Sequence, residues 1–320
     1  MAKQSQEPVG NRILITGAAG FMGSYLVPAL VQKGYDVVGL DLKGAFENGN
    51  LKGVVNRIKV VEADITNHGE LERLGFEVDY VHHLAAIAAP GVCAAQPKLA
   101  YDVNVLGTHN VLRYAKSHNV KRFLLTSSAH VYGISPRYMP TPEIHPVWLQ
   151  DDVYTATKIV DESLVKLFYE NYSMPYTTIR LFNCYGPRQT TDYFIPAKIH
   201  EALEKNKIVL RGSNVKKDFV YITDVIDAYV KILESDFVGE LNVGSGAATS
   251  LGTVARYIAK ALNVELSLAE DDLATSMQSD VSRARKILGW QTRVGLEDGL
   301  DMTIDSMKRQ RGYAEHPTAR

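Results

Sequence analysis

The feature that most constrains the fold is a glycine-rich turn between a short apolar strand and a helix near the N-terminus. Residues 12–16 read RILIT, a β-branched apolar run, and residues 17–23 form a turn that contains three glycines. A helical pattern follows over residues 21–33 and ends at Gly34, and a second apolar run, DVVGLD, occupies residues 36–41. Because both runs are too apolar to have one face in water, they predict a parallel sheet covered by helices on both faces.

The same alternation continues through the first 181 residues and then loosens. Further strands are predicted at residues 58–63, 80–84, 122–127, 176–181, 219–222 and 241–243, and further helices at residues 69–74, 98–117, 152–172, 224–234 and 251–262. We therefore expect an α/β protein whose doubly wound parallel sheet lies in residues 1–181, with residues 219–262 returning to it. Residues 182–218 and 263–320 are expected to form a smaller substrate-binding domain.

Composition disfavours several classes of protein. The chain has 320 residues, of which 46% are hydrophobic, and its 35 Lys+Arg and 36 Asp+Glu give a net charge of -1. This balance gives no general attraction to nucleic acid or to an anionic membrane, and no apolar run approaches the roughly 20 residues of a membrane-spanning helix. Cys93 and Cys184 are too few for a disulfide framework and lack metal-ligand spacing. The polar N-terminus shows no secretory signal, so we expect a cytoplasmic protein without a metal.

The glycine turn and an acid after the second strand indicate a dinucleotide site. Gly17, Gly20 and Gly23 allow the backbone to approach a pyrophosphate closely at the N-terminus of a helix. Asp41 ends the next strand, where its carboxylate can accept both ribose hydroxyls and would repel a 2′-phosphate, so NAD is favoured over NADP. The alternative is a structural turn beside a solvated aspartate.

Two further strand ends are candidates for the same site. Asp64, after the third strand, can reach an adenine amino group or, alternatively, cap the helix that follows. Leu84, Ala85 and Ala86 form a small apolar strand end against which a nicotinamide ring can lie flat.

Tyr154 and Lys158 lie four residues apart and therefore share one face of a helix. The usual pKa of tyrosine is about 10, and a neighbouring ammonium together with the positive nicotinamide ring would lower it. Such a pair can remove a hydroxyl proton while a hydride leaves the same carbon. Ser128, at the end of the fifth strand, can donate a hydrogen bond to the reacting oxygen. The alternative is a chance spacing on a solvated helix.

Nine short segments follow one another in a fixed order between residues 12 and 300: ITGAAGFMGS, HLAA, DVNVLGTHNVL, SSAHVYG, YTATK, RLFNCYGPRQ, KDFVYITDV, LNVGSG and ARKILGW. In this order they resemble the NAD-dependent epimerase/dehydratase family of extended short-chain dehydrogenases/reductases. The resemblance implies a seven-stranded Rossmann domain, a smaller nucleotide-sugar domain and a tightly held NAD. It also implies a catalytic Ser128, Tyr154 and Lys158, and an Asn104 that supports the active-site helix.

The resemblance also indicates substrate contacts, two of which depart from the family's pattern. Lys217 stands where an arginine usually binds the diphosphate, and Arg211 stands where an aromatic residue often lies against the base. Asn183 matches a phosphate-contacting position near Arg188; a structural role is the alternative for each. The expected NAD-binding residues are Gly17, Gly20, Phe21, Met22, Gly23, Asp41, Leu42, Asp64, Ile65, Leu84, Ala85, Ala86, Asn104, Tyr154, Lys158 and Leu181. The expected substrate-binding residues are Ser128, His130, Asn183, Arg188, Tyr193, Phe194, Arg211 and Lys217.

Ala129 and His130 occupy the positions at which similar 4,6-dehydratases carry an Asp-Glu pair. Lack of that carboxylate pair disfavours a 4,6-dehydratase, and decarboxylases of the family tend to keep a glutamate at the His130 position. The remaining chemistry is oxidation at C4, rotation of the 4-keto sugar and return of the hydride to its other face. His130 then contacts substrate, acts as an extra acid or base, or only fills the wall of the site.

We therefore expect an NAD-dependent nucleotide-sugar 4-epimerase that acts through a transient 4-keto intermediate. The alternative is a dehydrogenase or reductase of a nucleotide sugar or a smaller hydroxylated compound. The presence of Lys217 in place of the diphosphate-binding arginine favours this alternative. A non-catalytic NAD-binding regulator is a third reading, disfavoured because Ser128, Tyr154 and Lys158 are all present. Many relatives dimerise through the helices at residues 98–117 and 152–172, so a homodimer is expected, with no nucleic-acid or membrane partner.

Overall fold

The protein is described by a computed structural model over residues 11–149, 152–269 and 275–310. Its contacts divide the chain into two units. The first unit consists of Met1–Val131, Leu149–Arg180 and Tyr229–Leu241, and the second consists of Tyr132–Trp148, Leu181–Ala228 and Asn242–Arg320. Each unit is thus assembled from three separate segments of the chain.

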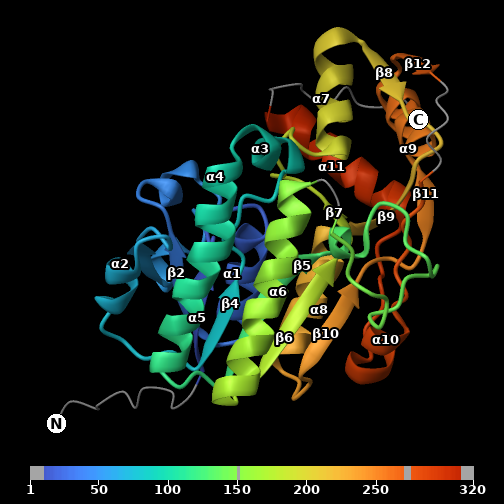
Figure 1. The fold of residues 1–320 in the computed structure, drawn as a ribbon. Helices are drawn as coiled ribbons and strands as arrows, with labels where there is room; N and C mark the ends of the chain where they lie inside the picture. Colours follow the sequence, from blue (N-terminus) through green and yellow to red (C-terminus); the bar gives the residue numbers. More distant parts are fainter. Residues whose placement is uncertain (1–10, 150–151, 270–274, 311–320) are drawn as a thin grey trace. The chain divides into compact units, whose positions relative to one another are not determined.

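A seven-stranded sheet forms the centre of the first unit, with the strand order β10-β6-β5-β4-β1-β2-β3 (Figure 1). The strands are β1 (Arg12–Thr16), β2 (Asp36–Asp41), β3 (Lys59–Glu62), β4 (Tyr80–His83), β5 (Arg122–Ser128), β6 (Tyr176–Leu181) and β10 (Gly239–Val243). The pairs β1–β2, β1–β4, β2–β3 and β4–β5 are parallel. The strand order reverses between β1 and β4, where ligands bind in doubly wound folds. The predicted fold class is confirmed.

The helices of the first unit cover this sheet and bury its apolar side chains. They are α1 (Gly23–Gln32), α2 (His68–Glu72), α3 (Pro90–Ala95), α4 (Pro97–Ala100), α5 (Thr108–Ser117) and α6 (Val153–Tyr172). Figure 1 shows α5 and α6 side by side in front of the sheet. Phe123 and Leu125 of β5 pack in one core cluster with Val111 of α5 and Val165 of α6. The apolar strands predicted from the sequence therefore lie at the centre of the fold.

Residues 98–117 do not form the single helix that the sequence predicts. The segment passes from α4 through a π-helical stretch, Tyr101–Gly107, into α5. Widened helical turns of this kind are frequent at functional sites, because they redirect a side chain. Asn104 lies in this stretch and is fully buried. Local sequence patterns did not predict this π-helical stretch.

The second unit contains two small sheets. The three-stranded sheet has the order β11 (Ala248–Ser250), β9 (Lys216–Tyr221), β7 (Asn183–Tyr185), and β12 (Glu265–Ala269) pairs in parallel with β8 (Lys207–Arg211). The helices are α7 (Phe194–Lys205), α9 (Leu251–Leu262), α10 (Ser282–Leu288) and α11 (Leu296–Gln310), while α8 (Ile222–Leu233) continues into the first unit. Asp218 of β9 is fully buried and accepts hydrogen bonds from the backbone N–H groups of Ser245, Gly246 and Ser279. One aspartate thereby fixes two loops of this unit.

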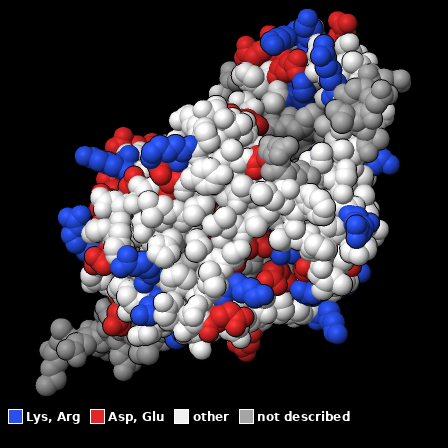
Figure 2. Space-filling view, in the orientation of Figure 1, with Lys and Arg blue, Asp and Glu red and all other residues white. Residues whose placement is uncertain are grey.

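Charged side chains of both signs are intermingled on the face seen in Figure 2, around an area with few charges. The area lies over α6, whose side chains Val160, Leu167 and Tyr172 are exposed. Phe168, on the same helix, is buried in the core of the first unit. Within the described parts of the chain, no helix has the length and apolar content needed to cross a membrane.

A buried ion pair ties α6 to the sheet. Arg180 of β6 lies with Nη2 2.7 Å from Oε2 of Glu162, and the two side chains are only 6% and 10% exposed. Glu162 Oε1 also accepts a hydrogen bond of 2.6 Å from the Ser127 hydroxyl of β5. The middle of α6 is therefore fixed to two neighbouring strands.

Glu162→Gln should destabilise the protein strongly, because it removes the carboxylate that pairs with the buried guanidinium of Arg180. We expect the free energy of unfolding, measured by chemical denaturation, to fall by about 3 kcal/mol. Glu170→Gln, at an exposed position of the same helix, should change it by less than about 0.5 kcal/mol. A small and equal effect of both substitutions would show that the ion pair does not hold the helix.

Candidate active site

The glycine turn after β1 packs closely against the chain that follows β4. Gly17 has a φ of +70°, and a Cβ at this position would lie 2.8 Å from the backbone nitrogen of Ala85. At Gly23, a Cβ would lie 2.3 Å from the carbonyl oxygen of Ala18. Side chains therefore fit at neither position. The resulting tight turn leads into the N-terminus of α1, the arrangement that suits a pyrophosphate.

Asp41 is held at the end of β2 by the glycine turn itself. Its Oδ2 accepts a 2.9 Å hydrogen bond from the backbone N–H of Ala19, and its Oδ1 accepts one of 2.8 Å from that of Leu42. Asn48 and Asn50 donate to the carbonyl oxygen of Ala19 at 2.9 and 2.8 Å. The carboxylate is thus fixed beside the turn, where a ribose would meet it. The sequence analysis missed both asparagines, because they lie in a glycine-rich loop without a recognisable pattern.

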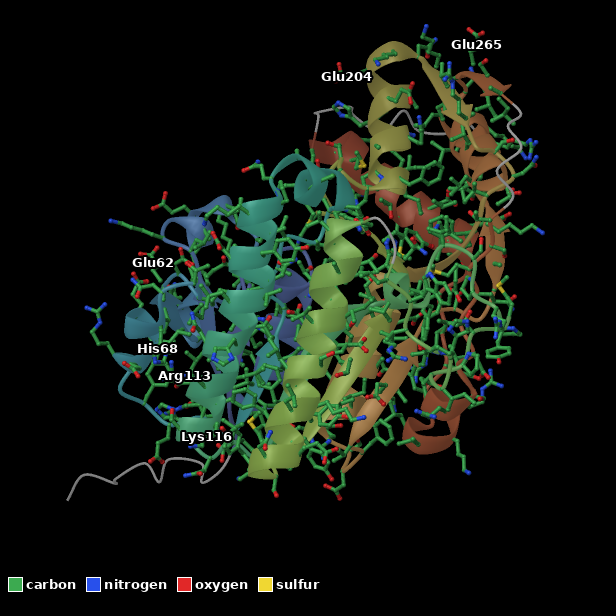
Figure 3. All side chains as sticks on the ribbon, in the orientation of Figure 1. Glu62, His68, Arg113, Lys116, Glu204 and Glu265 are labelled. Carbon is green, nitrogen blue, oxygen red and sulfur yellow. The ribbon has the colours of Figure 1, made fainter. Side chains whose placement is uncertain are left out.

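The loop after Asp41 is also held from β3. Glu62, labelled in Figure 3, ends β3 and accepts a 2.8 Å hydrogen bond from the backbone N–H of Gly44. Asp64 Oδ1 accepts from the backbone N–H of Thr66 at 2.9 Å, so this oxygen closes a local turn. Ile65, next to it, is buried. Leu42 is 56% exposed at the rim of the same region.

The other expected cofactor residues lie at the start of α1 and at the ends of β4 and β6. Phe21 and Met22 directly precede α1, and the ring of Phe21 lies edge-on to Tyr25. Leu84 and Ala85 donate from their backbone N–H groups to the carbonyl and the hydroxyl of Thr16, each at 3.2 Å. Ala86 follows them and is partly buried. Leu181 ends β6 and belongs to the second unit.

Asn104 joins the loop after β4 to α6. Its Oδ1 accepts a 2.7 Å hydrogen bond from the backbone N–H of Ile87. Its Nδ2 donates to the carbonyl oxygen of Ile87 at 3.1 Å and to the hydroxyl of Thr157 at 2.9 Å. Thr157 lies on α6 between Tyr154 and Lys158. The π-helical stretch therefore places one amide where it can fix the segment of α6 that carries both residues.

Ser128, Tyr154 and Lys158 come together in the first unit, at the end of β5 and in the first turns of α6. The side chain of Ser128 interacts with that of Tyr154 and favours its ionised form. Lys158 Nζ donates to the carbonyl oxygen of Thr126 at 3.2 Å and lies 3.3 Å from Oδ2 of Asp161. All three side chains are buried.

Asp161 is a buried acid that the sequence analysis did not single out. It is fully buried, and within the described residues its Oδ1 has no hydrogen-bond partner. Burial raises the pKa of Asp161 to about 6, while Lys158 opposes the shift. An aspartate next to a glutamate on a helix reads as solvated surface, so no pattern in the sequence marks it.

The protein's own residues raise the pKa of Tyr154, whereas Lys158 and the positive nicotinamide ring together were expected to lower it. Burial is the main cause of the rise, the nearby charge of Asp161 adds to it, and the interaction with Ser128 opposes it. Lys158 is drawn towards Asp161, which partly neutralises its effect on the phenol. A lowered pKa therefore requires a further positive charge beside the phenol, which the nicotinamide ring of NAD carries.

His130 and Asp152 flank the same tyrosine. The ring of His130 lies edge-on to that of Tyr154, with 5.7 Å between centroids, and His130 Nδ1 is 4.0 Å from Asp152 Oδ2. Asp152 caps α6 by accepting from the backbone N–H groups of Tyr154 and Thr155 at 3.1 and 3.2 Å. Interaction with His130, and then with Thr155, lowers the pKa of Asp152 to about 2 although burial opposes the shift.

The remaining expected substrate residues belong to the second unit. Asn183 Nδ2 donates to the carbonyl oxygen of Asp218 at 3.2 Å, and the ring of Phe194 stacks on that of Phe219. Lys217 lies on the same strand, β9, and burial lowers its pKa. These three are brought together around β9.

Three more of the expected substrate residues lie elsewhere in the second unit. Arg188 is exposed and has a φ of +72°, and Tyr193 directly precedes α7. Arg211 is exposed at the end of β8, in the other small sheet. Over the residues that the structure describes, no three His, Cys, Asp or Glu side chains are grouped as a metal site would require.

Residues 13–244 match the NAD dependent epimerase/dehydratase family, and the chain belongs to that family. It is 28% identical over 318 residues to UDP-glucuronic acid decarboxylase 2 of Arabidopsis thaliana, which covers 96% of this chain and 70% of that protein. Its structure is similar to that of UDP-glucose 4-epimerase with UDP-glucose from Thermotoga maritima, with a TM-score of 0.86, 26% identity and coverage of 94% and 99% of the two chains.

The structure is also similar to that of Thermus thermophilus UDP-glucose 4-epimerase in complex with NAD, with a TM-score of 0.84, 26% identity and coverage of 93% and 99%. The family resemblance read from the sequence is confirmed, and so is NAD as the cofactor. The tight turn at Gly17 and the fixed carboxylate of Asp41 fit this dinucleotide.

Asp161→Asn should change how stability depends on pH. The folded-state pKa of Asp161 is above that of an unfolded aspartate, about 3.9, so the folded protein binds the extra proton and this group's stabilisation is lost as pH rises towards 6. The unfolding free energy of the variant relative to wild type should therefore rise by about 2 kcal/mol between pH 4 and 7.

Chemical denaturation across this pH range measures the difference. Asp305→Asn, at an exposed position of α11, serves as the control and should show no such rise. A constant difference between Asp161→Asn and wild type would mean that Asp161 titrates as it does in the unfolded chain.

Proposed function

We propose that this protein is an NAD-dependent nucleotide-sugar 4-epimerase that acts through a transient 4-keto intermediate. The observation that carries the proposal is the buried pair of Ser128 and Tyr154, whose side chains interact. Ser128 is followed by Ala129 and His130, where 4,6-dehydratases of the family have two carboxylates. This set suffices for reversible oxidation at C4 but has no carboxylate pair for elimination. The similarity to two UDP-glucose 4-epimerase structures supports the same reaction.

The chain's own residues handle the proton of the C4 hydroxyl. NAD, when bound, supplies the acceptor and later the donor of the hydride. Ser128 holds the C4 oxygen by a hydrogen bond, and Tyr154 takes the proton of the C4 hydroxyl. Tyr154 returns this proton after the 4-keto sugar has rotated so that its other face points towards the nicotinamide ring. Lys158 is positioned by its contacts with Thr126 and Asp161. Asn104 fixes the position of α6 by its hydrogen bond to Thr157.

Residues of the second unit are proposed to bind the nucleotide part of the substrate. Lys217 is half-buried, and burial lowers its pKa. A bound anion beside the amine would offset this effect by stabilising the charged ammonium form. This supports Lys217 as the contact to a diphosphate, although a lysine offers a point charge and an arginine would offer a bidentate fork. Asn183, Arg188, Tyr193, Phe194 and Arg211 are proposed to complete this binding surface.

A decarboxylase of a UDP-uronic acid is the second candidate, and the similarity to the Arabidopsis decarboxylase favours it. His130 stands where such enzymes tend to have a glutamate, which weighs against it. A dehydrogenase or reductase remains a third candidate and predicts net formation or consumption of NADH. The three reactions differ in their products, so one assay separates them.

The assay incubates the purified protein with NAD and with UDP-, dTDP-, GDP- and CDP-hexoses and UDP-glucuronic acid. Chromatography identifies the sugars, and absorbance follows NADH. We expect interconversion of C4 epimers without net NADH, and a loss of about 1,000-fold in rate for Tyr154→Phe with NAD binding unchanged. Release of CO₂ from UDP-glucuronic acid would identify a decarboxylase, and stoichiometric NADH would identify a dehydrogenase.

We further propose a homodimer that associates through the face formed by α5 and α6. The support is the area with few charges over α6 and the exposure of Val160, Leu167 and Tyr172 on that helix (Figure 2). Sedimentation velocity should give twice the mass of one chain, and Leu167→Glu should give the mass of one. A wild-type protein that sediments as a monomer at micromolar concentration would refute the dimer.

A further inference from the structure

The pair of His130 and Asp152 has no part in 4-epimerisation as proposed above, because Tyr154 alone exchanges the hydroxyl proton. His130 nevertheless contacts both Ser128 and Tyr154. Its ring contacts that of Tyr154 edge-on at 77°, and its backbone N–H donates to the hydroxyl oxygen of Ser128 at 3.2 Å. A histidine at this place can reach a sugar whose C4 oxygen is held by Ser128 and Tyr154.

Asp152 is fixed so that it faces one nitrogen of this ring. Three hydrogen bonds hold its carboxylate: two from the backbone of Tyr154 and Thr155, and one of 2.6 Å from the Thr155 hydroxyl. Its Oδ2 lies 4.0 Å from Nδ1 of His130. A fixed carboxylate on this side favours a proton on Nδ1 and leaves Nε2 as the atom that accepts or gives a proton.

Exposure separates His130 from the two other histidines close to the site. His82 and His83 on β4 are 1% and 2% exposed, and burial lowers the pKa of each to about 3. Both nitrogens of His83 are engaged, by the hydroxyls of Thr16 and Thr108. The side chain of His130 is 32% exposed, so a ligand can reach it. Of these three histidines, His130 alone combines access with a carboxylate partner.

We propose that His130, positioned by Asp152, is an acid and base for the carbon next to C4 in the 4-keto sugar of the proposed function, on which this inference rests. The C–H bond at that carbon breaks and its proton moves to Nε2. The electron pair forms a C=C bond, and the ketone oxygen becomes an enolate oxygen held by the hydroxyls of Ser128 and Tyr154. Return of the proton from Nε2 to carbon restores the ketone.

This step needs no oxidant and no co-reactant, since it only moves a proton away from carbon and back. Its consequence is that hydrogen on C3 or C5 exchanges with solvent. Return of the proton to the opposite face would invert that centre. The enzyme therefore gains an activity on the carbon skeleton that Ser128, Tyr154 and Lys158 do not supply by themselves.

The test is deuterium incorporation by the NAD-loaded protein in D₂O, with UDP-glucose and separately with UDP-4-keto-6-deoxyglucose. Proton NMR and mass spectrometry detect deuterium at C3 or C5. For His130→Gln, the ratio of deuterium exchange to C4 interconversion should fall by about 100-fold. Asp152→Ser keeps an oxygen that can cap α6, and the ratio should fall by about 10-fold.

His109→Gln, a histidine on α5 whose ring contacts Phe168, is the matched control and should leave the ratio unchanged. Absence of exchange above a protein-free sample with both sugars would overturn the inference. An equal fall of both rates in His130→Gln would also overturn it, because His130 would then only hold the site together. Exchange of the 4-keto sugar that depends on His130, without C4 interconversion of UDP-glucose, would support this inference and refute the proposed epimerase.

Discussion

The position of α6 against β5 decides the geometry of the candidate active site, and polar contacts hold that helix at three points. Asp152 caps its N-terminus, Asn104 bonds Thr157 in its second turn, and Glu162 pairs with Arg180 and Ser127 further along. The contacts of Asn104 and Glu162 are buried, so their loss would remove hydrogen bonds in a medium of low polarity, whereas the Asp152 cap is partly exposed. The helix that carries Tyr154 and Lys158 is therefore held by directional bonds as well as by apolar packing.

Those buried contacts also set the electrostatics of the site. Burial raises the pKa of Tyr154, and Asp161 draws Lys158 to itself, so the protein alone holds the phenol protonated. A tyrosine of this kind becomes a better base when a positive ring lies beside it. The proposed activity is thus coupled to occupation by the oxidised cofactor, and this coupling follows from the low polarity around α6 rather than from any one residue.

Sequence patterns predicted the first unit far better than the second. The strands of the parallel sheet were predicted because buried strands are continuous apolar runs. In the second unit, the helix at residues 251–262 was predicted with its observed bounds. Strands β8 and β12 and helices α7, α10 and α11 were not predicted. β8 alternates between buried and exposed residues, and β12 between partly buried and exposed residues. Each pattern spans only five positions, which is too short to distinguish from a loop.

The sequence by itself determined the order of the strands and helices around the glycine turn, the choice of NAD, and the candidates Ser128, Tyr154 and Lys158. These depend on spacing along the chain, which a periodic backbone converts directly into position. Only the tertiary structure decided that Asp161 would share Lys158, that Asn48 and Asn50 would hold the glycine turn, and that Asp152 would face His130. Such contacts depend on which side chains are buried and on which residues lie close together in space. Local sequence patterns reveal neither of these.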